Sequence, residues 1–141
     1  MIAFADPVFS QEARAEAEVK TVAMRSLPSF YRGTQLDARS LAESLPQLPG
    51  TRIEVETIAK SLQAREDDIK LGLSATETAV KQSKLDNYRI VYFATHALVA
   101  GDLEEFVKAK AEPALVFTIP EKPSELDDGL LEAVRQPTML N

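Results

Sequence analysis

The stretch "YRIVYFATHALVAGD", residues 88–102, decides the fold class of this chain. Residues 90–94 form an uninterrupted apolar run, mostly of β-branched and aromatic side chains. Such a run is typical of a strand covered on both faces, as in the centre of a parallel sheet. His96, the only histidine, follows this run. The stretch therefore predicts a titratable side chain just beyond the carboxyl end of a central strand.

Three other segments of the sequence have strand patterns. Residues 1–5, "MIAFA", form a short apolar run that ends at Asp6-Pro7, a pair that favours a turn. Residues 68–73, "DIKLGL", alternate between apolar and polar side chains, which predicts a strand with one buried face. A fourth strand is predicted over residues 113–119, "PALVFTI".

Helices are predicted between these strands. Residues 11–27 are rich in helix formers. After a connecting region over residues 28–50, Thr51 and Glu54 have the spacing of a capping box, which predicts a helix that starts at Thr51. The spacing of the positions that follow places four apolar side chains on one face of this helix: Val55, Ile58, Ala59 and Leu62.

Ser74 and Glu77 have the same capping-box spacing, which predicts a helix that continues to about Lys84. Residues 127–135, "DDGLLEAVR", are predicted to begin another helix. Strands that alternate with helices are typical of a parallel sheet with crossover helices, so the predicted fold class is α/β. A chain of 141 residues has the size of a single domain.

Two polar side chains directly follow predicted strands. Asp6 comes after the first strand, and His96 comes after the central one. Ligands of open α/β sheets bind beyond the carboxyl ends of the strands, so both residues are predicted to lie at one shared edge. From the pattern alone, His96 is either a catalytic base or a structural histidine at a strand end. Asp6 is either a substrate contact or a turn former.

Composition narrows the classes of function. The net charge of −6 argues against a nucleic-acid-binding surface, which is usually basic. The absence of cysteine excludes disulfides and thiolate metal sites, and neither a metal nor a cofactor is predicted. The amino terminus lacks the basic region of a signal peptide, and the apolar runs are too short to span a membrane. The expected location is the cytoplasm.

A catalytic histidine needs a nucleophile, and the sequence offers no obvious one. Without cysteine, only hydroxyl groups remain, and none lies in the Gly-x-Ser-x-Gly pattern of a nucleophile elbow. The hydroxyl-bearing residues considered are Ser10, Ser74, Thr95 and Ser124. The acidic clusters "DLEEF" and "SELDD" are interpreted as solvated charge rather than as a pocket for basic side chains.

Five features in order along the chain resemble the CHAT domain, a caspase-like cysteine peptidase family common in bacteria and often attached to tetratricopeptide repeats. The resemblance extends from residue 1 to about residue 133, and "FATH" after the apolar run is its most specific part. The five features are the short strand before Asp6-Pro7, "LPQLPGTRIEVETIA", Ala75-Thr76, "YRIVYFATHAL", and "EPALVFTIPE" followed by "DDGLL".

The resemblance implies a three-layer αβα caspase-like fold, with a doubly wound, mainly parallel sheet that is incomplete at its carboxyl-terminal side. It implies that His96 is the general base. The family's nucleophilic cysteine ends the next core strand, which has no counterpart in this chain. The family usually has glycine after the histidine, where Ala97 stands here, and the backbone N–H at that position contacts the oxyanion.

The resemblance and the alternation of strands with helices together leave three hypotheses for residues 1–141. The first is a partial peptidase domain that acts on protein or peptide substrates, is inactive alone, and is joined in the full-length protein to a tetratricopeptide-repeat region. The second is a non-catalytic caspase-like interaction module that self-associates through an open sheet edge. The third is a receiver-like or flavodoxin-like domain, for which the sequence offers only Asp6 and no phosphate-binding loop.

Overall fold

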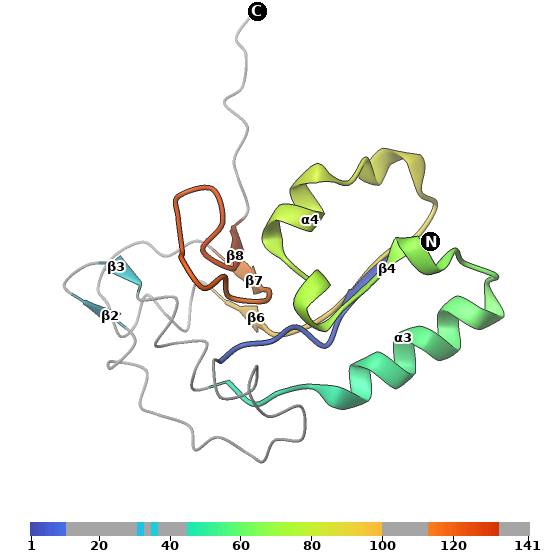
Figure 1. Cartoon of the computed structure of the whole chain (residues 1–141), viewed down its shortest axis with the longest axis horizontal. Helices are drawn as coiled ribbons and strands as arrows, with labels where there is room; N and C mark the ends of the chain where they lie inside the picture. Colours follow the sequence, from blue (N-terminus) through green and yellow to red (C-terminus); the bar gives the residue numbers. More distant parts are fainter. Residues whose placement is uncertain (11–30, 33–34, 37–44, 100–112, 133–141) are drawn as a thin grey trace, which may run out of the picture.

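The computed structural model describes residues 1–10, 31–32, 35–36, 45–99 and 113–132 (Figure 1). Its parallel sheet has the strand order β4-β1-β5, in which β1 spans Ile2–Ala5, β4 spans Ile69–Leu71 and β5 spans Val91–Ala94. Both neighbours of β1 are parallel to it. The helix predicted over residues 11–27 lies outside the described residues.

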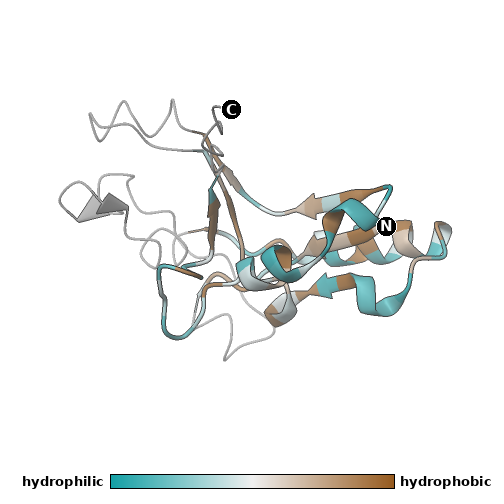
Figure 2. Cartoon of the chain, turned by 90° about the horizontal axis from the view of Figure 1, so that it is seen from above, coloured by the Kyte–Doolittle hydropathy of each residue, from teal (hydrophilic) through white to brown (hydrophobic). Residues whose placement is uncertain are grey.

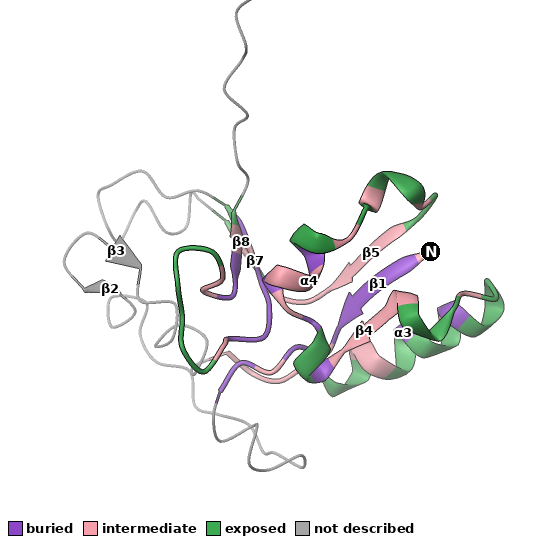
Figure 3. Cartoon of the chain, turned by 45° about the horizontal axis from the view of Figure 1, so that its top comes forward, coloured by how far each residue is buried: buried purple, intermediate pink, exposed green. Residues whose placement is uncertain are grey.

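The central strand of this sheet is β1, and the prediction that residues 90–94 would form the central strand is wrong, although side chains of β5 pack on both faces of the sheet. All four residues of β1 are buried, whereas all four of β5 are only half-buried (Figure 3). Within the described ranges, no strand pairs with the outer edge of β5. A continuous apolar run fits a strand in either position, because it reports a preference for burial and not the number of neighbours.

The two faces of β1 contact different helices because successive side chains of a strand point in opposite directions. On one face, Ala3 and Ala5 pack with Val55 of α3, which spans Pro49–Ser61. On the other face, Ile2 and Phe4 pack with Val80 of α4, which spans Glu77–Gln82. Figure 1 shows α3 and α4 on opposite sides of the strands, and Figure 2 shows hydrophilic stretches on the helices beside the apolar strands.

Both helices start at positions other than those predicted. α3 begins at Pro49 and its N-cap is Leu48, so Thr51 is already inside the first turn. Proline suits that first turn because its missing N–H would have no helical partner there. α4 is capped by Thr76, whose hydroxyl accepts a hydrogen bond from Ala79 N–H at 3.0 Å, and not by Ser74. The capping-box spacing therefore located both helices but misplaced their first residues.

Short elements connect the parallel strands. Gly72, with φ +57°, ends β4 and begins the 3₁₀ turn η3, so Leu73 does not continue the strand and is 60% exposed. The other 3₁₀ turns are η2 at Glu66–Asp68 and η4 at Leu85–Asn87.

β2 (Tyr31–Arg32) and β3 (Gln35–Leu36) form a separate antiparallel pair. No helix of the described residues is long and apolar enough to cross a membrane.

A second sheet is antiparallel, with the order β6-β7-β8. β6 spans Ala97–Leu98, β7 spans Ala114–Val116 and β8 spans Leu130–Glu132. β7 confirms the strand predicted over residues 113–119, but it does not join the parallel sheet. The helix predicted from residue 127 is wrong over the described residues, because Leu130–Glu132 form β8, and residues 133–135 lie outside the described residues. Leu130 is buried in a core with Phe9, Val116 and Ile119.

The turn that joins β7 to β8 is attached to α4 by a buried carboxylate. Glu77, 4% exposed, accepts hydrogen bonds from the backbone N–H groups of Asp128 (3.0 Å) and Gly129 (3.2 Å). It also forms an ion pair with Lys81 at 2.5 Å, and this hydrogen bond raises the pKa of Lys81. Asp127 accepts hydrogen bonds from the backbone and the hydroxyl of Thr78. We call this set of contacts the Glu77 clamp.

Replacing Gly129 by alanine is expected to lower the free energy of unfolding by about 2–4 kcal/mol. Gly129 has φ +84°, and an added Cβ would overlap Ile119 Cδ1 and lie 3.2 Å from Ile119 Cα. Gly50→Ala is the matched control, because nothing lies within 4 Å of an added Cβ at that site in α3. Urea denaturation of both variants checks the difference. Equal stabilities would show that Gly129 is not required by its backbone geometry.

Candidate active site at the carboxyl edge of the parallel sheet

The structure places Asp6 and His96 at the same edge of the sheet, as predicted. β1 and β5 are adjacent and parallel, with Ala5 paired to Ala94. The next residues along these strands are Asp6 and Thr95, and His96 follows. Both side chains therefore begin at the carboxyl ends of neighbouring strands, where open α/β sheets bind their ligands.

The imidazole of His96 is held by two contacts that the sequence did not reveal. Its Nε2 atom lies 2.9 Å from the carbonyl oxygen of Pro46. Its ring centroid lies 5.3 Å from that of Phe9, which is buried. A carbonyl oxygen can only accept a hydrogen bond, so Nε2 carries the proton. In the neutral ring, Nδ1 is then the basic atom.

The segment that carries Pro46 is itself fixed on both sides. Leu48 C=O accepts hydrogen bonds from the backbone N–H (3.0 Å) and the hydroxyl (2.6 Å) of Thr51, at the start of α3. The Gln47 amide, oriented to satisfy both of its neighbours, donates to Pro7 C=O at 2.8 Å and accepts from Phe9 N–H at 2.9 Å. Pro46 and Phe9 are therefore tied to each other as well as to His96.

The backbone around His96 is attached to β7. Val116 N–H donates to His96 C=O at 2.9 Å, and the Thr95 hydroxyl donates to Val116 C=O. This contact directs the Thr95 hydroxyl at the backbone of β7, which does not fit a role as nucleophile. The antiparallel sheet thus sets the position of His96 relative to the parallel one.

The backbone N–H of Ala97 is not used by the ladder between β6 and β7. Residue pairs of an antiparallel ladder alternate between hydrogen-bonded and non-hydrogen-bonded. Since Val116 N–H bonds to His96 C=O, the pair Ala97 and Leu115 is the non-hydrogen-bonded one. The Ala97 N–H therefore points away from β7, and the residue is exposed. Its φ is not positive, so alanine fits the backbone here without strain.

Asp6 is engaged with α3. Its Oδ2 atom accepts a hydrogen bond from Arg52 Nε at 2.9 Å, and its side chain is 17% exposed. Its backbone N–H donates to the Thr51 hydroxyl at 2.9 Å, and its φ is +48°. Aspartate is among the residues that tolerate this conformation. These contacts join the end of β1 to the first turn of α3, and the predicted substrate contact of Asp6 stays a prediction.

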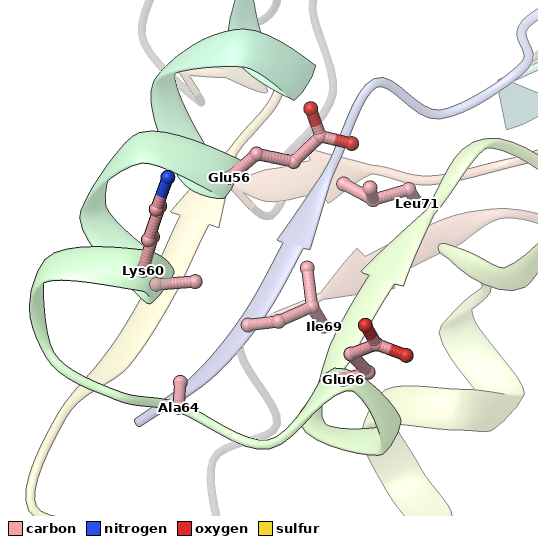
Figure 4. Close-up of a pocket in the computed structure, with 7 residues that line it drawn as sticks. Glu56, Lys60, Ala64, Glu66, Ile69 and Leu71 are labelled. Atoms are coloured by element: carbon pink, nitrogen blue, oxygen red, sulfur yellow. The ribbon is translucent and has the colours of Figure 1, made fainter.

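A cavity of about 490 Å³ lies between α3 and β4 (Figure 4). None of its lining residues belongs to the set that holds His96, so this cavity is separate from the edge that carries the histidine. The lining residues are Glu56, Ala59, Lys60, Ala64, Glu66, Ile69 and Leu71. In the described ranges, no three His, Cys, Asp or Glu side chains gather as a metal site would require.

Comparison with known proteins identifies one family. The family described as the CHAT domain matches residues 2–139, which is nearly the whole chain. No curated protein and no solved structure matches the chain.

Proposed function

Because the chain belongs to the CHAT domain family, a family of caspase-like peptidases, we propose that it supplies the catalytic histidine of a cysteine endopeptidase domain. The observation that carries this proposal is the hydrogen bond from His96 Nε2–H to Pro46 C=O, which leaves Nδ1 as the base. The proposal includes the three-layer αβα caspase-like architecture, a bacterial source and a cytoplasmic location.

The proposed reaction follows from the geometry around His96. Nδ1 takes the proton of a cysteine thiol, and the thiolate attacks the carbonyl carbon of the scissile peptide bond. The Nε2–H bond to Pro46 C=O orients the ring and stabilises the imidazolium that forms. The Ala97 N–H, which forms no hydrogen bond with β7, donates a hydrogen bond to the oxyanion. The imidazolium then gives its proton to the leaving amine as the carbon–nitrogen bond breaks, and water releases the acyl group from sulfur.

The thiol comes from outside these 141 residues, since the sequence contains no cysteine. We place it at the outer edge of β5, which has no partner strand within the described residues. A strand added there in parallel would lie about 4.8 Å from β5 and end beside Thr95 and His96. In the full-length protein, a tetratricopeptide-repeat region accompanies this domain, and the substrate is a protein or peptide.

The chain on its own is expected to show no peptidase activity that depends on His96. A base without a thiol cannot form the acyl-enzyme. Fluorogenic peptides and unfolded casein, incubated with the purified chain and with His96→Ala, measure this directly. Cleavage by the wild-type chain that disappears in His96→Ala would contradict the proposed source of the nucleophile.

Reading the coding DNA beyond the codon for Asn141 in all three frames tests where the thiol comes from. A strand-like apolar run that ends in cysteine would support the proposal. The absence of such a run would favour the second candidate function, a non-catalytic interaction module. The free outer edges of β4 and β5 in the described part of the chain support that second candidate, because free edges pair with other strands. A monomer at high concentration in light scattering would count against self-association.

A further inference from the structure

The cavity between α3 and β4 has an apolar floor and a charged rim. The floor is built by Ala59, Ala64, Ile69 and Leu71. Figure 4 shows the Glu56 side chain extending from α3 toward the end of β4, while the Lys60 ammonium points away from Ile69 along the helix. The volume of about 490 Å³ is within the range of protein ligand sites. We call this cavity the α3–β4 groove.

The floor of the groove continues two rows of side chains that cross the parallel sheet. The pairing of the strands places Tyr92, Ala3 and Ile69 in one row, and Ala94, Ala5 and Leu71 in the next. All six side chains belong to the cluster that faces α3. In the described part of the chain, β4 pairs only with β1, so both rows stop at the groove. A strand beside β4 would place the next member of each row in this cavity.

Between its two apolar positions, the added strand has one residue that faces the opposite side of the sheet. The side chains on that side determine which residue is favoured there. Lys70 lies in a row with Phe4 and Phe93, on the face away from α3. A strand beside β4 would place its middle side chain next to Lys70, where an acidic residue is favoured. On the groove side, Glu56 and Glu66 form no ion pair with another described residue, and both are exposed. Basic side chains at the two ends of the added strand would pair with them.

We propose that the α3–β4 groove binds an extended peptide segment of a partner protein, which adds a strand to the free edge of β4. The segment has apolar residues at two alternate positions, an acidic residue between them and a basic residue two positions beyond each. Strand addition of this kind obtains affinity from main-chain hydrogen bonds and specificity from alternate side chains. The site is distinct from the His96 edge, and the proposal holds whether or not the chain is part of a peptidase.

The probe that tests this proposal is a heptapeptide, blocked at both ends, with the sequence Lys-Thr-Val-Glu-Ile-Thr-Lys. Its pattern is the same in either strand direction. The matched peptide exchanges the charges, as Glu-Thr-Val-Lys-Ile-Thr-Glu. Titration of the ¹⁵N-labelled full chain, followed by NMR, is expected to shift the amides of Lys70 and its neighbours. The first peptide should bind roughly ten times more tightly than the second, because the three favourable charge pairs, with Glu56, Glu66 and Lys70, become repulsive.

Variants of the chain distinguish how much peptide binding depends on the charges at the rim of the groove and how much on its open volume. The double variant Glu56→Gln and Glu66→Gln is expected to weaken binding of the first peptide by roughly 3- to 10-fold. Ala64→Trp, which fills the groove, is expected to abolish binding. Glu125→Gln removes an exposed carboxylate elsewhere and should leave binding unchanged. The proposal is overturned if both peptides bind equally, if neither binds, if the shifts map away from β4, or if a second copy of the chain occupies this edge.

Discussion

Replacing Phe4 by alanine is expected to lower the free energy of unfolding by about 3–5 kcal/mol. Phe4 has no exposed surface and lies at the centre of β1. Its ring stacks on Phe93 with centroids 5.5 Å apart and lies nearly perpendicular to the ring of Phe117, with centroids 6.2 Å apart. Phe117 follows β7, so these three rings join the two sheets. Alanine would leave a cavity at this junction.

Urea denaturation of wild type and Phe4→Ala measures the loss. Small domains are stable by about 5–15 kcal/mol, so the variant is expected to be marginally folded at room temperature. Leu126→Ala is the control, because Leu126 is 80% exposed and its truncation should change stability by no more than about 0.5 kcal/mol. A loss below 1 kcal/mol for Phe4→Ala would show that the rings do not hold the sheets together.

Replacing Glu77 by leucine is expected to lower the free energy of unfolding by about 2–5 kcal/mol. The Glu77 clamp gives the backbone N–H groups of Asp128 and Gly129 a buried acceptor, and leucine removes it. The loss should be local as well as global, since the clamp is what attaches the turn between β7 and β8 to α4. Hydrogen exchange is therefore expected to accelerate first at residues 124–130.

Two comparisons make this second prediction specific. Glu77→Gln keeps one side-chain acceptor and should recover part of the lost stability, whereas Glu125→Gln, at an exposed position of the same turn, should have no effect. If Glu77→Leu unfolds the chain uniformly, with no early exchange at the turn, the clamp is not a local attachment. Wild-type stability in Glu77→Leu would exclude the clamp altogether.

Local patterns in the sequence predicted where strands form, but they did not predict which strand lies at the centre of the sheet. The runs around Phe4, Ile69, Phe93 and Val116 each form a strand, because alternation and continuous apolar runs depend on local burial. The central position of β1 was not predicted, since the number of neighbours of a strand depends on pairing between distant segments. The extended form of Leu130 was missed for a related reason, as its core partners lie far away in the sequence.

The candidate site was predicted only in outline. The carboxyl-edge rule placed Asp6 and His96 together correctly, because it depends on the parallel order of the strands alone. The role of Pro46 had no signal in the sequence, since the contact uses a backbone carbonyl that every residue has. Gln47 and Phe9 were also missed. The "LPQLP" segment, which carries two of these residues, was predicted only as part of a connecting region and as part of the family resemblance.

The role of His96 as general base is tested by the rate of peptide cleavage by a longer protein, in which the chain is extended by the residues encoded after Asn141. A cysteine-bearing strand is expected to restore turnover, and His96→Ala is then expected to lower kcat/KM by about 10²–10⁴-fold while the fold is retained. Arg89→Ala, at an exposed position before β5, should leave the rate unchanged. Turnover that is equally fast in His96→Ala would contradict the assignment of His96 as the general base.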